Sequence, residues 1–244
     1  MTGPAGFRLS PQQRRLWQLQ SALGERPLRA RARVRIRGPL DPSLLRAAVD
    51  DAVSRYEILR TTFPCPPGLT LPVQQIADQA PVLWHEAQAE GEAALDEIRE
   101  TLERDPFDFA RGPLLRLALA RIAEEEHVLI LVLPALCADA ATLRNLVREI
   151  SGEGGSAPLQ YVDLAEWQND LLENEETAEG REHWESWDPS LCRSLRFAFE
   201  TAGTQEDRFE PRSLAVPLEG ELVRSARALA AELDASLPTL FLAA

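Results

Sequence analysis

An uninterrupted apolar run, VLILVL, occupies Val128–Leu133. A strand made only of apolar residues has no solvent-facing side, so both faces of its sheet must be covered. We therefore expect His127–Leu133 to be a central strand in a layered α/β domain, with helices flanking the sheet. Leu114–Ile122 is also largely apolar and precedes it across three glutamates, Glu124–Glu126. This arrangement predicts an antiparallel strand pair joined by an acidic turn.

Five arginines alternate with apolar residues in the segment RARARVRIR, at Arg29, Arg31, Arg33, Arg35 and Arg37. Alternation with a period of two predicts a half-buried strand with one arginine face and one apolar face. The arginine face has two interpretations. It is either a solvated face that discourages pairing between sheet edges, or an electrostatic docking stripe for an acidic partner. Residues 1–60 hold 12 arginines against 5 acidic residues, within a chain of net charge −13.

Capping signals and helical periodicity mark the other elements. Asp41-Pro42 predicts a helix N-cap followed by proline at the first helical position, with apolar residues at helical spacing through Val53. Further helices are expected at Glu92–Arg104, Ala140–Ile150, Tyr161–Leu172, Gly180–Trp187 and Glu221–Leu233, with another beginning in the final SLPTLFLAA. Extended segments are expected at Ile58–Phe63, Leu71–Ile76, Val82–Glu86 and Arg212–Leu218.

The composition excludes several kinds of chemistry. No lysine occurs, so the chain holds no Schiff-base lysine and no P-loop lysine. The three histidines and three cysteines lack metal-ligand spacing, so we expect no metal site and no disulfide framework. The acidic charge argues against nucleic acid as a partner. With no signal peptide and no apolar run near the roughly 20 residues that cross a bilayer, we expect a cytoplasmic protein without membrane contact.

The end of the apolar strand, Pro134–Ala140, is the best-placed position for chemistry because clefts form where strands end and helices begin. Its side chains are mostly apolar. Cys137 is either a nucleophile or, among leucine and alanine, a buried and inert thiol. Asp139 precedes a helix and is placed to cap it, or to pair with an arginine from another strand.

This strand end and four other segments of the chain resemble the condensation domain of nonribosomal peptide synthetases. Phe7–Leu19 (FRLSPQQRRLWQL) is similar to the opening motif of that family, S-x-A-Q-x-R-L-W-x-L. Tyr56–Phe63 (YEILRTTF) is similar to its second motif, R-H-E-x-L-R-T-x-F. Pro106–Leu119 (PFDFARGPLLRLAL) resembles the stretch before the central strands, and Tyr161–Gln168 (YVDLAEWQ) resembles Y-x-D-Y-A-x-W-Q. These motifs follow the family's order over most of the chain.

The resemblance implies a fold like that of chloramphenicol acetyltransferase, with two similar α/β lobes and an active site in the tunnel between them. Residues 1–175 then correspond to a condensation-like N-terminal lobe with a mixed, mostly antiparallel sheet flanked by helices. Residues 176–244 correspond to linker helices and the first elements of a second lobe that is truncated. Whether the stop at Ala244 is natural stays open.

The family's catalytic motif, HHxxxDG, is degenerate in this chain. Aligned on the strand end, its two histidines fall on Pro134 and Ala135, its aspartate on Asp139 and its glycine on Ala140. The resemblance implies that the second histidine positions or deprotonates the acceptor amine, and neither proline nor alanine titrates. It also implies that Asp139 pairs with Arg60. Heterocyclisation relatives use an aspartate pair, D-x-x-x-x-D, whose first member also falls on Pro134.

We therefore expect no catalytic residue and a non-catalytic condensation-like domain that serves as a structural or docking element. Its expected partners are adenylation or carrier-protein domains of the same synthetase. No cofactor is expected in the chain itself, because any phosphopantetheine is carried by a partner carrier protein. One alternative is a recruitment platform for a tailoring enzyme or carrier protein. Another is an altered condensation or heterocyclisation lobe that uses Asp139 or Cys137.

Overall fold

The computed structural model describes residues 6–23, 28–154, 159–174, 177–188, 190, 214 and 216–243. The chain divides into two compact units, Met1–Glu200 and Thr201–Ala244. The sequence analysis places the end of the N-terminal lobe at residue 175, whereas the boundary between the two compact units follows Glu200.

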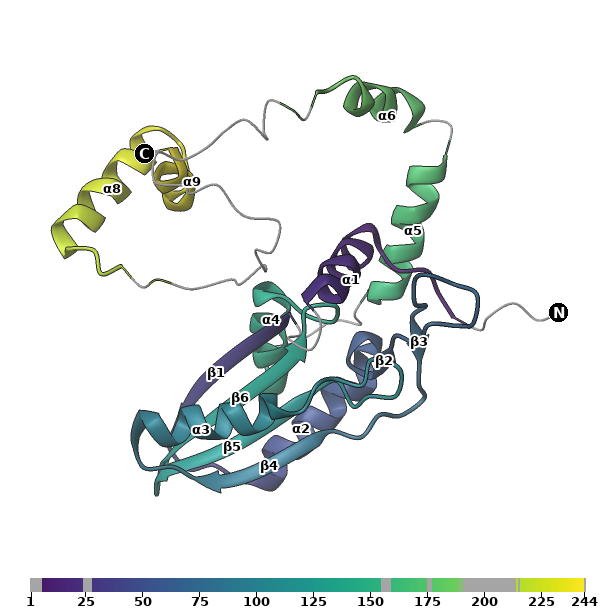
Figure 1. Cartoon of the computed structure of the whole chain (residues 1–244). Helices are drawn as coiled ribbons and strands as arrows, with labels where there is room; N and C mark the ends of the chain where they lie inside the picture. The colour runs from purple at the N-terminus through teal and green to yellow at the C-terminus, as the bar shows by residue number, and fades with distance from the viewer. Residues whose placement is uncertain are drawn as a thin grey trace. The chain divides into compact units, whose positions relative to one another are not determined.

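A four-stranded sheet forms the centre of the first unit (Figure 1). Its strands are β1 (Arg29–Arg37), β6 (Glu126–Pro134), β5 (Arg116–Ala123) and β4 (Leu83–Gln88), in that order across the sheet. β1 and β5 are antiparallel to β6, whereas β4 is parallel to β5. The sheet is therefore mixed and mostly antiparallel, as the sequence predicts.

Helices cover both faces of this sheet. The α-helices with described bounds in the first unit are α1 (Pro11–Leu23), α2 (Pro42–Arg55), α3 (Gly91–Arg104), α4 (Ala140–Ile150), α5 (Tyr161–Glu173) and α6 (Ala178–Glu185). α3 packs on β5 and β6, while α4 packs on β1 and on α2 (Figure 1). Every residue of β6 except its first is buried, which confirms the central strand expected from the apolar run.

Side-chain caps begin two of the helices: the predicted helix α2, and α1, which the sequence analysis does not predict. Asp41 accepts hydrogen bonds from the backbone N–H groups of Ser43 and Leu44, and Pro42 is the first helical residue of α2. α1 begins with a reciprocal capping box: Gln13 N–H donates to Ser10 Oγ at 3.1 Å, and Ser10 N–H donates to Gln13 Oε1 at 3.0 Å.

Among the extended segments expected in the first unit, two are predicted wrongly. Ile58–Phe63 begins as a short 3-10 helix, η1 (Glu57–Arg60), and only Thr61–Thr62 is a strand, β2. The turn is stabilised because Thr61 Oγ1 donates to the Glu57 carbonyl at 2.7 Å. β2 pairs with β3 (Gln75–Ile76), which is much shorter than the expected strand.

The second unit contains α8 (Gly220–Glu232) and α9 (Leu237–Ala243), which contact each other. α8 confirms the helix predicted at Glu221–Leu233. The strand expected at Arg212–Leu218 is wrong for the described residues of that range, which carry no strand, and the rest of it lies outside the described residues. Among the described helices, none has the length and apolar character required to cross a bilayer.

Candidate functional site at the end of the central strand

The turn from β6 into α4 places the residues that correspond to the family's catalytic motif. Pro134 is buried at the last position of β6, and Ala135 follows it half-buried. Ala135 N–H donates to the Leu28 carbonyl at 2.8 Å, and Cys137 N–H donates to the Pro134 carbonyl at 2.9 Å. The backbone of this turn is therefore well held, although Pro134 and Ala135 present no titratable group.

A buried polar network supports the same turn from α1. The Gln13 side chain is 1% exposed, and its Nε2 donates to the Leu136 carbonyl and to Gln74 Oε1, both at 3.1 Å. Gln74 Nε2 in turn donates to the Arg8 carbonyl at 2.8 Å. Because buried polar groups are costly unless hydrogen-bonded, this network fixes α1 against the strand end.

Helix α5 joins the network through Tyr161, whose hydroxyl lies 2.8 Å from Ser10 Oγ. Burial raises the pKa of Tyr161, an effect that its hydrogen bond to Ser10 opposes and the nearby Asp139 and Cys137 reinforce. The sequence analysis did not assign Gln13, Gln74 or Tyr161 to the site. The Ser10-x-x-Gln13 capping pattern was the available signal for the first of them.

Asp139 caps α4, as one of the two sequence interpretations expects. Its Oδ1 accepts hydrogen bonds from Thr142 N–H at 2.7 Å and from Thr142 Oγ1 at 2.8 Å. These bonds lower the pKa of the Asp139 carboxyl, because they stabilise its charged form. Asp139 and Ala140 are both exposed.

The Arg60–Asp139 pair implied by the resemblance is not formed, and this expectation is corrected. Both residues are described, and Arg60 instead donates to the Ala77 carbonyl and pairs with Glu57 Oε1 at 3.4 Å. The physical reason is local: η1 brings Glu57 within reach of Arg60, while both hydrogen bonds of Asp139 go to the first turn of α4.

Cys137 is enclosed at the same turn. Its side chain is 5% exposed, and burial raises the pKa of the thiol far above its usual range. A thiol held protonated is a poor nucleophile. The groups at this strand end are therefore a neutral thiol, a neutral phenol and an ionised carboxylate committed to a helix cap, a set unsuited to proton transfer near neutral pH.

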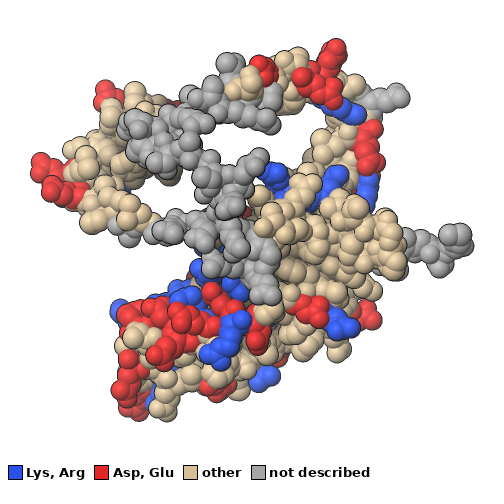
Figure 2. Space-filling view, viewed as in Figure 1, with Lys and Arg blue, Asp and Glu red and all other residues tan. Residues whose placement is uncertain are grey.

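The five arginines of β1 form ion pairs within the chain. Arg33 pairs with Glu92 at 2.5 Å and with Asp96 at 2.8 Å, both on α3. The remaining pairs are Arg29–Glu103 at 3.9 Å, Arg31–Glu103 at 2.8 Å, Arg35–Glu92 at 3.1 Å, Arg35–Glu126 at 2.8 Å and Arg37–Glu126 at 3.6 Å. Figure 2 shows acidic and basic side chains intermingled over this part of the molecule. The strand predicted from the alternating pattern is confirmed as β1. The positive charge of its five arginines is largely offset by these acidic partners.

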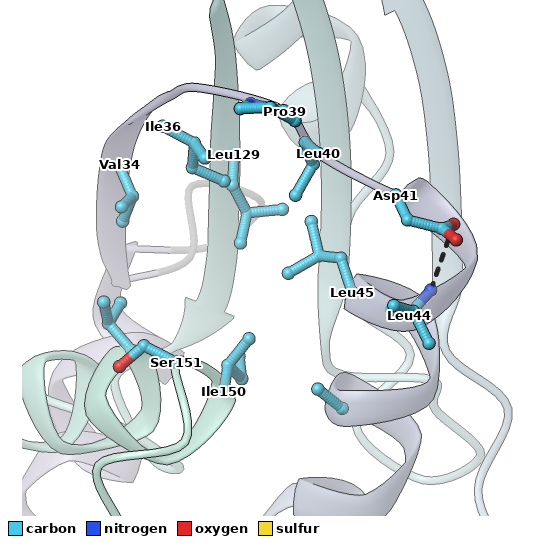
Figure 3. Close-up of a pocket in the computed structure, with 12 residues that line it drawn as sticks. Val34, Ile36, Pro39, Leu40, Asp41, Leu44, Leu45, Leu129, Ile150 and Ser151 are labelled. Atoms are coloured by element: carbon cyan, nitrogen blue, oxygen red, sulfur yellow. Dashed lines mark hydrogen bonds between the residues drawn. The ribbon is translucent and has the colours of Figure 1, made fainter. Parts of the chain in front are cut away.

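The other face of β1 borders an apolar cavity of about 400 Å³ between β1, α2 and α4 (Figure 3). Val34 and Ile36 of β1 face Leu45 of α2 across it, and the Asp41 carboxylate at its rim is already bonded to the start of α2. The other residues of its lining have no acidic or basic side chain. Within the described part of the chain, no cluster of three or more His, Cys, Asp or Glu side chains is arranged to hold a metal ion.

The chain is similar to known proteins in both sequence and structure. The family described as "Condensation domain" matches residues 6–244. The chain is 35% identical over 231 residues to the "Dimodular nonribosomal peptide synthase" of Bacillus subtilis (strain 168), covering 88% of this chain and 9% of that protein. It therefore spans about a tenth of the length of this curated relative.

Solved structures share the fold. The condensation domain of the monacolin K polyketide synthase MokA superposes with a TM-score of 0.74 at 21% identity, over 96% of this chain and 57% of that one. The X-domain from teicoplanin biosynthesis superposes with a TM-score of 0.60 at 32% identity, over 72% of this chain and 40% of that one. In its complex with OxyB, the X-domain gives a TM-score of 0.60 at 28% identity, over 77% and 45%.

The order of the motifs, the mixed sheet flanked by helices and the match across residues 6–244 agree with one another. The fold is that of a chloramphenicol acetyltransferase-like lobe. The chain belongs to the condensation-domain family of nonribosomal peptide synthetases.

Proposed function

We propose that this domain does not form amide bonds and instead serves as a structural or docking element of a peptide synthetase. The observation that carries the proposal is the presence of proline and alanine at positions 134 and 135, at the end of β6 where the family motif has two histidines. General acid–base catalysis requires a titratable side chain at the reacting atoms, and these two residues have none.

The neighbouring groups support the same proposal. Cys137 is buried with a raised pKa, which leaves little thiolate to attack a thioester. Asp139 is occupied by the α4 cap, and an Asp139 carboxylate alone supplies only one member of the aspartate pair of heterocyclisation relatives. The support around the site is retained, since Gln13 and Tyr161 still brace the turn from α1 and α5.

The partners follow from the proposed role. Adenylation and carrier-protein domains of the same synthetase are the neighbours that a structural or docking domain contacts. The chain needs no cofactor of its own in this role, because the phosphopantetheine arm belongs to the carrier protein. The domain works in the cytoplasm, where the substrates of a synthetase are activated.

Amide formation between the two carrier proteins that flank this domain tests the proposal. The intact parent synthetase is loaded on both carriers, and the wild type is compared with Asp139→Asn and Cys137→Ser. Asparagine keeps the helix cap and removes the carboxylate, while serine removes the thiol. We expect no amide product above background in any of the three proteins. Product that disappears in either variant would instead establish an altered transfer reaction at that residue.

A second candidate is recruitment of another protein in trans. It is favoured by the similarity to the X-domain from teicoplanin biosynthesis, which assembles with OxyB. The most available arginines of β1 are Arg37, whose side chain is 78% exposed, and Arg31, which is 51% exposed. These two arginines are the positions of the stripe that can contact an acidic carrier protein or tailoring enzyme electrostatically.

Titration of the chain with a carrier protein distinguishes this candidate. Reversing both charges in an Arg31→Glu/Arg37→Glu variant is expected to weaken binding and its dependence on salt, because exposed charges steer association. Arg46→Glu is the matched control, because Arg46 is an exposed position on α2 that takes no part in the ion pairs of the stripe among the described residues. Equal affinity of all three proteins would show that the stripe serves only the fold.

A further inference from the structure

A second cavity lies at the other end of the central strand. It has a volume of about 550 Å³ and is entered between β4, β5, β6 and the start of α2. Its polar lining residues are Glu86, Gln88, Arg121, Glu124 and His127. His127 is near the start of β6, whereas Pro134 ends it, so the two places are separated by about 23 Å of extended strand. This cavity is therefore distinct from the strand end discussed above.

Strand pairing brings the polar residues of the cavity together. Arg121 of β5 is the register partner of His127 on β6 and of Gln88 on β4. Directly paired residues point to the same face of a sheet, so these three side chains form one row across it. Glu86 lies in the neighbouring row, opposite Leu119.

His127 is an unpartnered polar side chain in this row. The residue is only 6% exposed, and its Nδ1 is buried without a hydrogen-bond partner. Its ring makes no hydrogen bond with any described residue. Because Nδ1 is enclosed, the imidazole can meet a ligand only through Nε2, and a proton on Nε2 makes it a donor toward the cavity. A ligand in the cavity leaves the enclosed Nδ1 as it is, and the hydrogen bond that the site can still form is one from Nε2–H to an acceptor atom of the ligand.

The charged side chains of the cavity have few partners among the described residues and can therefore bind a ligand. Arg121 donates through Nε to the Ala123 carbonyl at 3.3 Å and forms no ion pair within the described residues. The Glu86 carboxylate accepts one bond, from Trp84 Nε1 at 2.8 Å, and Glu124 has no ion pair in the described part of the chain. The site thus offers two donors that suit a carboxylate and two carboxylates that suit an ammonium group.

We propose that this cavity binds a small zwitterion, an α-amino acid with an apolar side chain, whose carboxylate is held by Arg121 and His127 and whose ammonium is held by Glu86 and Glu124. A simple anion is opposed by the two glutamates, and a simple cation is opposed by Arg121. Leu40 and Leu119 supply the apolar wall against which the side chain of the ligand rests. The proposal is independent of whether the strand end is catalytic.

Histidine NMR on the whole chain tests this site. The sequence has three histidines, His85, His127 and His183, so ring resonances of protein labelled at histidine are assigned with His85→Gln and His183→Gln variants. Leucine is the probe, and we expect it to shift the His127 resonance saturably while His85 and His183 do not move. Leucinamide lacks the carboxylate and N-acetylleucine lacks the ammonium. Each is expected to bind at least about tenfold more weakly, since it forfeits charge-assisted hydrogen bonds.

A pair of arginine variants completes the test. Arg121→Gln is expected to abolish the leucine-dependent shift, whereas Arg111→Gln retains it. Arg111 is an appropriate control because its side chain is 87% exposed and contacts only Asp108 among charged groups of the described residues. The proposal is overturned if leucine leaves the His127 resonance unmoved, if N-acetylleucine or leucinamide binds as tightly as leucine, or if Arg121→Gln binds leucine normally.

Discussion

At the scale of single residues, the residues that support the turn after β6 differ from the residues at the positions of the family's catalytic motif. Gln13 donates to the Leu136 carbonyl, and Asp139 caps the following helix. These bonds hold a backbone that presents proline and alanine where the family motif carries histidines. The atoms that maintain the shape of this turn therefore differ from those that would move a proton in the family motif.

Because Asp139 caps α4, two substitutions of this residue are expected to differ in their free energy of unfolding. Asp139→Ala removes the acceptor for Thr142 N–H and is expected to lower the free energy of unfolding by about 1 kcal/mol, a typical cost for losing an N-cap. Asp139→Asn retains an acceptor and is expected to stay close to the wild type. Urea unfolding of the three proteins measures the difference. Equal loss in both variants would mean that the charge of Asp139, rather than its cap, stabilises the fold.

Acid pH acts on the same residue. The pKa of Asp139 is lower in the folded state than the unfolded value of about 3.9, so folding favours the ionised form. Its contribution is present above the unfolded pKa and is lost as pH falls through the folded pKa. We expect the advantage of the wild type over Asp139→Ala to shrink over that acid range, as followed by urea midpoints. An advantage that grows on acidification would contradict the lowered pKa.

Thiol labelling tests the inert character of Cys137. Cys65 is exposed and Cys137 is buried, and burial raises the pKa of the latter. In a Cys192→Ser background, we expect a disulfide reagent at mildly alkaline pH to modify one thiol rapidly and the second only after unfolding. A Cys65→Ser variant identifies the slow thiol as Cys137. Rapid labelling of Cys137 in the native protein would make it a candidate nucleophile again.

At the scale of elements, β1 and α3 hold each other by charge on one face of the sheet while α2 and α4 cover the other. The arginine stripe therefore stabilises the layer of α3 as well as marking a strand. The pairs are partly exposed, so each contributes modestly and weakens with salt.

Charge reversal at Arg33 measures this contribution. Arg33→Glu places a carboxylate against Glu92 and Asp96 and is expected to cost about 1 kcal/mol of unfolding free energy at low salt. The double variant Arg33→Glu/Glu92→Arg is expected to recover part of that loss, and Arg46→Glu on α2 serves as the control. If reversal at Arg33 costs no more than at Arg46, then α3 is held by its apolar face alone.

Periodicity and capping residues predict most elements of this fold, because local spacing determines them. The Asp41-Pro42 start of α2 and the apolar strand β6 are both found where the sequence indicates. The local signal fails at Ile58–Phe63, where a side-chain bond from Thr61 to the Glu57 carbonyl favours a 3-10 turn. Side-chain partners are less predictable, because they depend on elements distant in the sequence. Gln13 and Gln74 meet across 61 residues.

At the scale of the whole molecule, the buried central strand β6 has a distinct feature at each end. One end carries Pro134 and Ala135, at the positions where the family motif has two histidines, and the other carries the cavity at His127. Because β6 is buried along nearly its whole length, the two sites belong to one packed unit. The proposed docking role requires only that this packed fold be retained, because contacts with carrier or adenylation domains need no group that moves a proton.

The most direct test of the central claim is the intact mass of the downstream carrier protein in the wild-type parent synthetase. Both flanking carriers are loaded, and transfer across this domain is followed by mass spectrometry of the acceptor thioester. We expect the acceptor to keep the mass of its own amino acid, without the added mass of the donor acyl group. An acceptor that gains the donor mass at a rate dependent on this domain would contradict the account.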